Sequence, residues 1–506
     1  MKKVLSILIL VFVLTLTISL SSCELFINTS TTTSTTNTST KLPPDDDPTD
    51  DHKHSYTSIV TNPTCTELGF TTYSCECGNS YIDDYIDALG HKFGDWIVIK
   101  EPSITETGLK ERYCECGAKE SEAIEQLTEE IKSSEGLIFE LNDDKNSYSV
   151  VGIGTCKDLD IVIPTTYEGL PVTSIGYRAF YWCDTITSVT MGNSVTLIDN
   201  GAFAGCMSLA NVTIPNSVIS IGNEAFKCCY SLVDLSIPNS VISIDVSAFA
   251  ECTSLTNVTI PNSVKTIGEV AFGGCKSLTK IVIPDSVTEI GYRAFVSCYG
   301  LENIEVDKNN MYYCSIDGNL YNKDATTLIQ YAIGKTNTSF DIPNTVTTIA
   351  SDAFRNAISL TNIEIPSCVT SIGKCAFLNC LALESIEIPD SVTYIGEAAF
   401  ENNCSLATVK MPKYITTISG YMFRECRALV SIEIPNTVTF IGEYAFDSCH
   451  ALTSIVIPIS VTTIEEYAFN KCSKLTIYCE VDSKPKGWES GWKSSTISAV
   501  WGYTTK

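Results

Sequence analysis

A repeat of 23 residues dominates the second part of this chain. Its clearest mark is Ala-Phe, or a close variant, whose phenylalanine occurs twelve times at ten intervals of 23 residues and one of 59. A unit of this length is too small to bury its own apolar face, so such units stack on one another and share a core. The chain is therefore predicted to form a solenoid of about twelve coils. The phenylalanines are Phe180, Phe203, Phe226, Phe249, Phe272, Phe295, Phe354, Phe377, Phe400, Phe423, Phe446 and Phe469.

Each unit contains a short stretch in which apolar and polar residues alternate before a proline. In one unit Val212 and Ile214 alternate with Asn211 and Thr213, and Pro215 follows. This period of two predicts a β-strand with the valine and isoleucine in the core and the asparagine and threonine in solvent. Pro215 has no N–H to donate, so the strand is expected to end there. The Ala-Phe segment that follows suits a single helical turn, which makes the predicted fold mainly β with short helical turns.

Two further columns of residues follow the same period. A cysteine stands three residues after most of the phenylalanines, and Ala357 and Asn403 replace it in two units. A small apolar thiol suits a buried column, and its replacement by alanine or asparagine argues against a redox or metal role. A serine or threonine, such as Ser217, follows the proline of most units. Its hydroxyl is expected to bond backbone groups of the adjacent coil.

The repeat unit resembles that of the BspA-like leucine-rich-repeat surface proteins of bacteria. The stretch SLTNVTIPNSVKTIGEVAFGGC at 254–275 carries the resemblance most clearly, and the stretches at 317–336 and 475–494 also look like features of this family. The resemblance covers roughly residues 136–506, about three quarters of the chain. It implies a curved leucine-rich-repeat solenoid on a bacterial surface, in a family often involved in adhesion to host matrix proteins or to other cells.

The pattern also predicts where the solenoid begins, is interrupted and ends. The solenoid is expected over 161–474, after a linker and amino-terminal cap at 126–160. The long interval corresponds to an insert at 300–339, whose central Asp-Gly-Asn predicts a β-hairpin that the solenoid accommodates. The last apolar face of an array needs a cover, so 475–506 is predicted to be a carboxyl-terminal cap. This cap contains Trp488, Trp492 and Trp501.

The amino terminus carries a targeting signal. Lys2 and Lys3 precede an apolar run, and Leu-Ser-Ser-Cys at its end resembles the site cut by the lipoprotein signal peptidase. The resemblance implies that residues 1–22 are removed and that Cys23 carries a lipid, which would anchor the protein on the extracellular face of the bacterial cell membrane or on the cell surface. An ordinary secretory signal and an uncleaved anchor are the alternatives. All three place the remaining chain outside the membrane.

Residues 23–51 form a low-complexity segment rich in threonine, serine and aspartate. They contain almost no apolar side chains after the first few positions, so they are predicted to be a flexible stalk. The whole chain has a formal net charge of −26. This charge argues against a nucleic-acid partner, because neutralising phosphates requires clusters of lysine and arginine.

A second repeat, with a period of 39 residues, lies at 52–125. His52 recurs as His91, and the pair Cys75 and Cys77 recurs as Cys114 and Cys116. The spacing predicts two small β-rich modules. They resemble the short cysteine-containing modules that precede repeats in secreted proteins of anaerobic Gram-positive bacteria.

Zinc binding in the first module, within 52–91, is the main chemical hypothesis, because thiolate and imidazole are the ligands that zinc prefers. Against it, the two cysteines of the Cys-x-Cys pair are closer than in the usual Cys-x-x-Cys, and Ile104 replaces Cys65 in the second module, leaving that module one ligand short. A disulfide or simple core use of the cysteines remains open. No other cofactor is expected. The candidate ligands are some of His52, His54, Cys65, Cys75, Cys77 and His91.

The solenoid itself is expected to bind a partner and to catalyse nothing, because neither a Gly-x-Ser-x-Gly elbow nor a His-Glu-x-x-His helix appears. Its outward strand residues are neutral in the amino half and acidic in the carboxyl half. The expected partner is therefore a basic or amide-rich extracellular protein surface, or a glycan. The candidate partner-binding residues are Asn211, Thr213, Asp234, Asn257, Thr259, Asn362, Glu364, Glu387 and Glu433.

Other functions were weighed against this prediction. The strand face could be an ordinary solvated surface, with binding at the insert or at the amino-terminal modules. A surface lipoprotein that captures a small solute is a competing class, but such proteins usually close two α/β lobes over a pocket, and the sequence shows no alternation of strands and helices. The sequence leaves the oligomeric state open.

Overall fold

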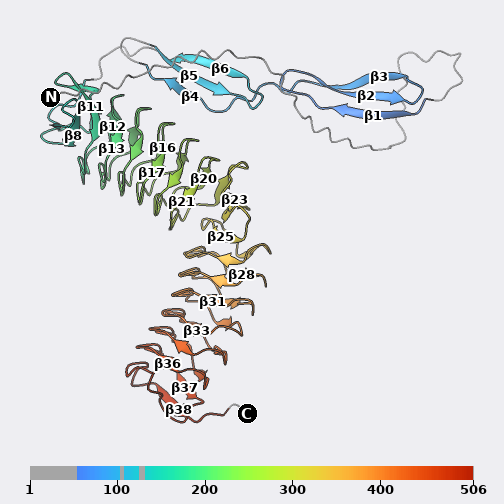
Figure 1. Cartoon of the computed structure of the whole chain (residues 1–506), viewed down its shortest axis with the longest axis vertical. Coiled ribbons are helices and arrows are strands. Elements are labelled where there is room, and N and C mark those ends of the chain that lie inside the picture. The colour runs from blue at the N-terminus through green and yellow to red at the C-terminus, as the bar shows by residue number, and fades with distance from the viewer. Residues whose placement is uncertain (1–53, 103–106, 125–131, 505–506) are drawn as a thin grey trace, which may run out of the picture. The chain divides into compact units, whose positions relative to one another are not determined.

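The computed structural model describes residues 54–102, 107–124 and 132–504. The predicted signal peptide, Cys23, the stalk and His52 lie outside this range. The chain divides into two compact units, Met1–Glu130 and Ile131–Lys506. Every regular element within the described residues is a strand (Figure 1). Within the same residues there is consequently no helix with the length and apolar character of a membrane span.

The first unit contains two three-stranded antiparallel sheets, one from each 39-residue module. The strands follow each other in the sheets as they do in the chain. In both modules Cys-x-Cys-Gly forms the tight turn between the second and third strand, where Gly78 and Gly117 adopt φ of 92° and 87°. The strands are β1 Tyr56–Thr61, β2 Gly69–Cys75 and β3 Ser80–Ile86 in the first module, and β4 Ile97–Lys100, β5 Gly108–Tyr113 and β6 Lys119–Ile124 in the second.

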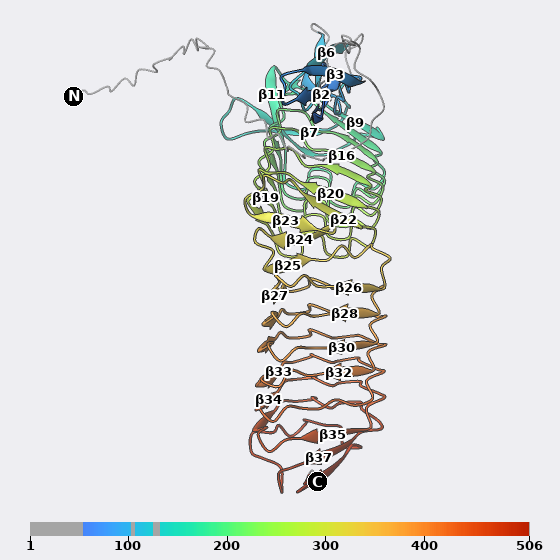
Figure 2. The ribbon, with the colours of Figure 1, turned by 90° about the vertical axis from the view of Figure 1, so that its right-hand side faces the viewer.

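The second unit is a solenoid in which each coil contributes short strands to two rows (Figure 2). In the first row, the strands that pair run parallel, and those of the regular coils pair residues 23 positions apart, as Asp234 pairs with Asn257. This row comprises β9 Asp160–Ile163, β12 Ser188–Met191, β14 Asn211–Thr213, β16 Asp234–Ser236, β18 Asn257–Thr259, β20 Lys280–Ile283, β22 Asn303–Val306, β26 Ser339–Asp341, β28 Asn362–Glu364, β30 Ser385–Glu387, β32 Thr408–Lys410, β35 Ser454–Ile457 and β37 Thr476–Cys479, with β38 Ser498–Trp501 after it.

The second row lies on another side of the coils and is also parallel, as the pairing of Ser220 with Ser243 shows. It begins with the hairpin of β7 and β8. Its strands are β7 Ile138–Leu141, β8 Tyr148–Gly152, β11 Leu170–Ile175 with β10 Thr166–Tyr167 beside it, β13 Leu197–Ile198, β15 Ser220–Ile221, β17 Ser243–Ile244, β19 Thr266–Ile267, β21 Glu289–Ile290, β25 Thr327–Gln330, β27 Thr348–Ile349, β29 Ser371–Ile372, β31 Tyr394–Ile395, β33 Thr417–Ile418, β34 Phe440–Ile441 and β36 Thr463–Ile464.

The Ala-Phe segment is a series of turns, and the expected helical turn is not found there. The residues two before and two after the phenylalanine have positive φ, as Glu224 (58°) and Cys228 (61°) have around Phe226. The N–H of Phe226 donates to the carbonyl of Ala248 in the next coil (2.8 Å), whereas the N–H of Cys229 donates to Phe226 in its own coil (3.2 Å). Because alternate N–H groups point to the neighbouring coil, this segment forms a third row of hydrogen bonds between coils.

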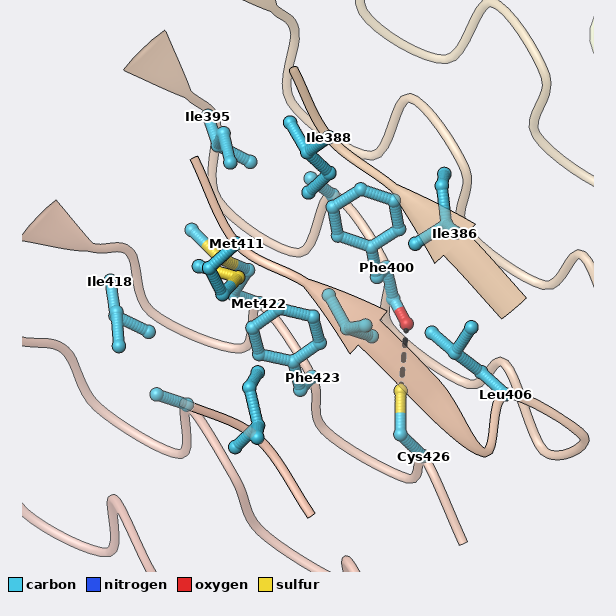
Figure 3. Close-up of a cluster of buried hydrophobic side chains, with 14 of the residues drawn as sticks. Ile386, Ile388, Ile395, Phe400, Leu406, Met411, Ile418, Met422, Phe423 and Cys426 are labelled. Carbon is cyan, nitrogen blue, oxygen red and sulfur yellow. Dashed lines mark hydrogen bonds between the residues drawn. The ribbon is translucent and has the colours of Figure 1, made fainter. Parts of the chain in front are cut away.

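The phenylalanines stack into a buried column through the core. Neighbouring ring centroids lie 5.1–6.0 Å apart from Phe180 to Phe295 and 5.0–5.6 Å apart from Phe354 to Phe469. All of these side chains are at most 2% exposed. Figure 3 shows Phe400 and Phe423 surrounded by isoleucine and methionine side chains of the same and neighbouring coils. The core prediction for this column is confirmed.

The cysteine column is buried as predicted, and it also forms hydrogen bonds that the sequence did not suggest. The thiol of Cys426 donates to the carbonyl of Phe400 in the preceding coil (3.1 Å; Figure 3), and the thiols of the other complete coils do the same. Asn403 replaces the thiol with its amide, which donates to Phe377 (3.0 Å). Where Ala357 removes the donor, the Gln330 amide donates to the Tyr331 carbonyl instead (2.9 Å). The column therefore satisfies buried backbone carbonyls.

Most of the serine and threonine column connects coils as expected, whereas the buried hydroxyl of Ser263 has no hydrogen-bond partner among the described residues. The hydroxyls of Ser217 and Ser391 donate to the carbonyls of Val195 and Val369 in the preceding coils, both at 2.6 Å. These side chains therefore satisfy backbone acceptors that would otherwise be left without a partner between the strand rows.

The insert is one enlarged coil. It is 36 residues longer than a regular coil, and in it β23 Tyr313–Ile316 and β24 Asn319–Asn322 form an antiparallel hairpin. Tyr331 then takes the place of the phenylalanine, with its ring 5.2 Å from that of Phe354. Neither strand row pairs directly across the insert within the described chain, and the buried core divides there into two clusters. The coils of this unit follow a curved path (Figure 1).

The last coil is covered by tryptophans. Trp488 and Trp492 are 1% and 3% exposed. The ring of Trp492 meets that of Phe469 edge to face at 5.9 Å, and the Trp488 indole N–H donates to the carbonyl of Val461 (3.1 Å). The phenylalanine column therefore ends against aromatic side chains, and the buried indole N–H of Trp488 has a hydrogen-bond acceptor.

Replacing Phe249 by alanine tests the column. Its side chain is fully buried between Phe226 and Phe272, so the cavity should lower the free energy of unfolding by about 3–5 kcal/mol. The control is Tyr299→Ala on the surface, which should cost less than about 0.5 kcal/mol. Denaturant unfolding followed by circular dichroism measures both. Equal effects of the two substitutions would show that the stacked phenylalanine rings do not stabilise the fold.

Neighbouring cysteines provide a test of the thiol column. Cys229 is fully buried, and burial raises its pKa well above the usual value, whereas the adjacent Cys228 lies partly at the surface. Alkylation of the native protein at mild alkaline pH should therefore modify Cys228 and spare Cys229, and denaturant should expose both. Peptide mass spectrometry distinguishes the two sites. Rapid native alkylation of Cys229 would show that the column is open to solvent.

Candidate binding surface and candidate metal centre

The first strand row presents a regular polar surface. Each strand places two outward side chains on either side of one inward residue, because successive side chains of a strand point to opposite faces. In β28, for example, Asn362 and Glu364 are exposed and Ile363 is buried. Parallel pairing in register aligns these side chains into columns, and Figure 2 shows the strands that carry them following one another along the coils.

All nine candidate partner-binding residues are exposed. Eight lie on strands of this row, and Glu433 lies at the equivalent position of a coil in which Ser431 forms only an isolated bridge with Thr408. This exposed surface will be called the strand face. Asn257 donates to Asp234 within it (2.9 Å), and Lys410 forms an ion pair with Glu387. By contrast, no described residue forms an ion pair with Glu364 or Glu433. The exposed strand-face residues are Asn211, Thr213, Asp234, Asn257, Thr259, Asn362, Glu364, Glu387 and Glu433.

The acidity of the carboxyl half is concentrated in one column. Asp341 and Glu364 lie side by side in β26 and β28, and Glu387 occupies the same position in the next coil. Like charges in direct register repel one another and destabilise the pair of strands. Lys410, which follows in the column, neutralises Glu387, so the acidic surface is less extensive than the sequence suggested.

A second polar surface, which sequence reasoning missed, lies on the turns that follow the phenylalanines. Asn379 donates to Asn356 (2.9 Å) and Asn402 donates to Asn379 (2.8 Å), forming a ladder of amides across three coils. The recurrence of asparagine two residues after the phenylalanine was the available signal. A shallow groove beside the ladder is lined by Arg355, Asn379, Glu401, Asn402, Arg424 and Arg427.

A buried carboxylate joins the coils on either side of the insert on the same turns. Asp352 is 3% exposed and forms ion pairs with Arg293 (2.8 Å) and Arg355 (3.0 Å). The Tyr292 hydroxyl donates to the same carboxylate. Burial, followed by this hydrogen bond, raises the pKa of Tyr292. Tyr292 and Arg293 precede the insert and Asp352 follows it, so the pairing holds the enlarged coil between two regular ones.

The predicted metal ligands fall into two clusters within the first unit. Cys65 and His91 lie with Cys114 and Cys116, and all four ligand atoms are within 4.8 Å of one another. The Cys65 and Cys114 sulfurs are 3.8 Å apart, and His91 Nδ1 lies 3.2 Å from the Cys116 sulfur. Sequence reasoning had left Cys114 and Cys116 one ligand short, because it looked for the fourth ligand within their own module.

Cys75 and Cys77 form the other cluster, with His54. His54 Nδ1 lies 3.2 Å from the Cys77 sulfur. The predicted set is therefore divided, with Cys75 and Cys77 apart from Cys65 and His91. His52 lies outside the described residues. His54, the histidine of this cluster, was one of the candidates in the sequence.

Hydrogen bonds to sulfur favour the thiolate in both clusters. The backbone N–H of Cys116, and then the His91 imidazole, lower the pKa of Cys114 to about 6. The backbone N–H of Cys77, and then His54, lower the pKa of Cys75 to about 6. Hydrogen bonding with Cys116, followed by desolvation, raises the pKa of Cys65 to about 11. In the cluster of Cys65, Cys114 and Cys116, the surroundings therefore favour the thiolate of Cys114 and disfavour the thiolate of Cys65.

These features define the class of protein. Parallel coils of 23 residues, an aromatic column and an exposed strand face make the second unit a leucine-rich-repeat solenoid. The BspA type leucine rich repeat region, a known family, matches residues 173–302, 330–450 and 399–481, in six copies. The chain belongs to this family.

Solved structures agree with this assignment. A leucine rich cell surface protein from Faecalibacterium prausnitzii is 31% identical, with 74% of this chain and 98% of that chain covered and a TM-score of 0.51. A leucine-rich repeat protein from Eubacterium ventriosum is 26% identical, with 74% and 95% covered and a TM-score of 0.53. The pneumococcal vaccine antigen PcpA, at 18% identity, 74% and 99% coverage and a TM-score of 0.54, shares the fold. No curated protein matches the chain.

Removing the carboxylate of Asp352 tests the junction across the insert. Asp352→Ala leaves Arg293 and Arg355 without their buried partner, and such a loss should lower the free energy of unfolding by about 3 kcal/mol. Glu397→Ala, which breaks the exposed ion pair with Lys374, is the control and should cost less than about 1 kcal/mol. Denaturant unfolding measures both. A smaller loss for Asp352→Ala than for the control would show that the junction does not depend on this carboxylate.

Proposed function

We propose that the solenoid is a non-catalytic binding region, displayed outside the cell, whose strand face adheres to an extracellular protein or glycan. The observation that carries the proposal is the alignment of exposed polar side chains into columns over successive coils. Such a surface is long, and parallel pairing with a neighbouring coil, as between β16 and β18 or between β26 and β28, restricts its backbone. A rigid array limits the conformational entropy lost on binding.

The chemistry of the strand face supports a partner with basic or amide-rich groups. Amide and hydroxyl groups such as Asn211 and Thr213 offer both donors and acceptors in the amino half. In the carboxyl half Asp341 and Glu364 are neighbours of like charge. A cationic partner would relieve this repulsion, and complementary charge would speed the encounter.

The location proposed for this binding rests on the amino-terminal signal. A lipid on Cys23 would hold the protein at the membrane, and residues 23–51 would act as the stalk. The relative from Faecalibacterium prausnitzii is described as a cell surface protein, which supports a similar location for this chain. Adhesion requires the solenoid to reach past the cell envelope, and a stalk serves that purpose.

Charge reversal on the strand face tests the proposal. Glu364→Lys with Glu433→Lys should weaken binding of the full chain to an immobilised extracellular-matrix preparation on the order of tenfold at low salt, about 1.4 kcal/mol. The matched control is Glu269→Lys with Glu289→Lys, which changes the net charge equally at exposed positions on or beside the second strand row. Biolayer interferometry measures both variants. Unchanged binding by the first variant, or equal losses in both, would remove the strand face from the binding site.

A further inference from the structure

We infer that a thiolate-binding metal ion of the zinc type is held between the two amino-terminal modules by Cys65, His91, Cys114 and Cys116. Cys65 comes from the loop between β1 and β2 of the first module, and the two other cysteines come from the turn between β5 and β6 of the second. His91 lies in the segment that connects the modules. The ion would therefore cross-link the modules, and neither module holds the whole ligand set.

The spacing of the sulfurs fits tetrahedral coordination. Zinc–sulfur bonds are about 2.3 Å long, so two sulfurs of a tetrahedral site lie about 3.8 Å apart. The sulfurs of Cys65 and Cys114 are separated by 3.8 Å. The ligand atoms of all four residues lie within 4.8 Å of one another, which permits a single ion to reach each of them. Three thiolates and one imidazole form one of the common structural zinc sets.

Backbone hydrogen bonds hold the ligands in place independently of an ion. The N–H of Gly117 donates to Cys114 (2.8 Å) and the N–H of Cys114 donates to Ala118 (2.8 Å), which fixes the turn that carries both cysteines. The N–H of Leu89 donates to Thr64 (2.9 Å), so the connecting segment is bound to the loop of Cys65. This last bond brings His91 and Cys65 to the same place from different parts of the chain.

The arrangement explains an irregularity in the 39-residue repeat. If Cys65 serves the following module, its equivalent Ile104 would serve a third module, and no third copy of the Cys-x-Cys turn follows in this sequence. The equivalent position before the first module is Phe26. A complete set of three cysteines and one histidine is therefore present once, at the single junction between two modules. When the second module is considered alone, Ile104 in place of Cys65 looks like the loss of a ligand.

Other uses of these cysteines fit the geometry less well. A disulfide requires a sulfur separation of about 2.05 Å, and it would leave the third cysteine and the histidine without a role. Burial does not account for the cluster, because His91 and Cys116 are exposed. Hard cations such as Ca²⁺ and Mg²⁺ prefer oxygen ligands, whereas thiolate and imidazole in a tetrahedral arrangement select zinc among common metals.

Metal titration of the full chain tests the inference. The protein is stripped with a chelator under a non-thiol reductant, and Zn²⁺ or Co²⁺ is then added to the wild type, Cys65→Ser, Cys65→His and Cys228→Ser. Cobalt is used because tetrahedral thiolate coordination gives it intense visible bands and a sulfur-to-metal charge-transfer band. Competition with a chelator gives the affinity. Cys228 is a partly exposed solenoid cysteine and serves as the matched control.

The wild type should bind one more equivalent than Cys65→Ser, or bind that equivalent at least about tenfold more tightly. Cys65→His should retain this metal equivalent with a weaker charge-transfer band, because an imidazole replaces one thiolate. Retention in this variant would show that the loss in Cys65→Ser is not a folding defect. Cys228→Ser should equal the wild type. Chelation should also increase proteolysis between β3 and β4 in the wild type. Identical binding by Cys65→Ser and the wild type, or a Cys65–Cys114 disulfide without metal in protein isolated without reductant, would overturn the inference.

Discussion

The solenoid depends on hydrogen bonds between coils, because no coil satisfies its own backbone. The N–H of Phe226 finds its acceptor on Ala248 in the next coil, and the paired strands do the same at Ser220 and Ser243. The Cys426 thiol adds a bond to a carbonyl of the preceding coil. Unpaired polar groups in the core would be costly. Each coil must therefore keep the period of 23 residues, or a longer coil must still place its residues in the rows and columns of its neighbours. The insert does so through Tyr331.

The 23-residue period made the strand row and its exposed face predictable. It placed Val212, Asn211 and Thr213 on the correct strand and put the outward pair in solvent, and it identified the buried phenylalanine and cysteine columns. The Ala-Phe turn was not predictable in the same way. Residues with positive φ there include Glu224 and Val270, which carry no local preference for that conformation. Bonds to neighbouring coils determine it, and those bonds are visible only once coils are stacked.

For the candidate sites, too, the sequence pattern predicted the residue types, but not the contacts that form between modules or between coils. Residue types singled out Cys65 and His91 as candidate ligands, and the structure brings them together, but the repeat suggested that each module was a closed unit, so Cys114 and Cys116 seemed to lack a partner. On the solenoid, the acidic column at Glu364 could be predicted from alternation alone. Its neutralisation at Glu387 by Lys410 could not, since that pair joins residues of adjacent coils.

Deletion of one whole coil tests most directly whether coils are equivalent units that depend only on their neighbours. Removing residues 232–254 joins Ser231 to Leu255 and preserves the period, so the protein should unfold cooperatively and lose only the stability of one coil and its interface. Removing residues 232–243, about half a repeat, would misalign every column that follows. The account predicts a folded protein in the first case and a severely destabilised one in the second, as measured by denaturant unfolding. Equal destabilisation by the two deletions would contradict it.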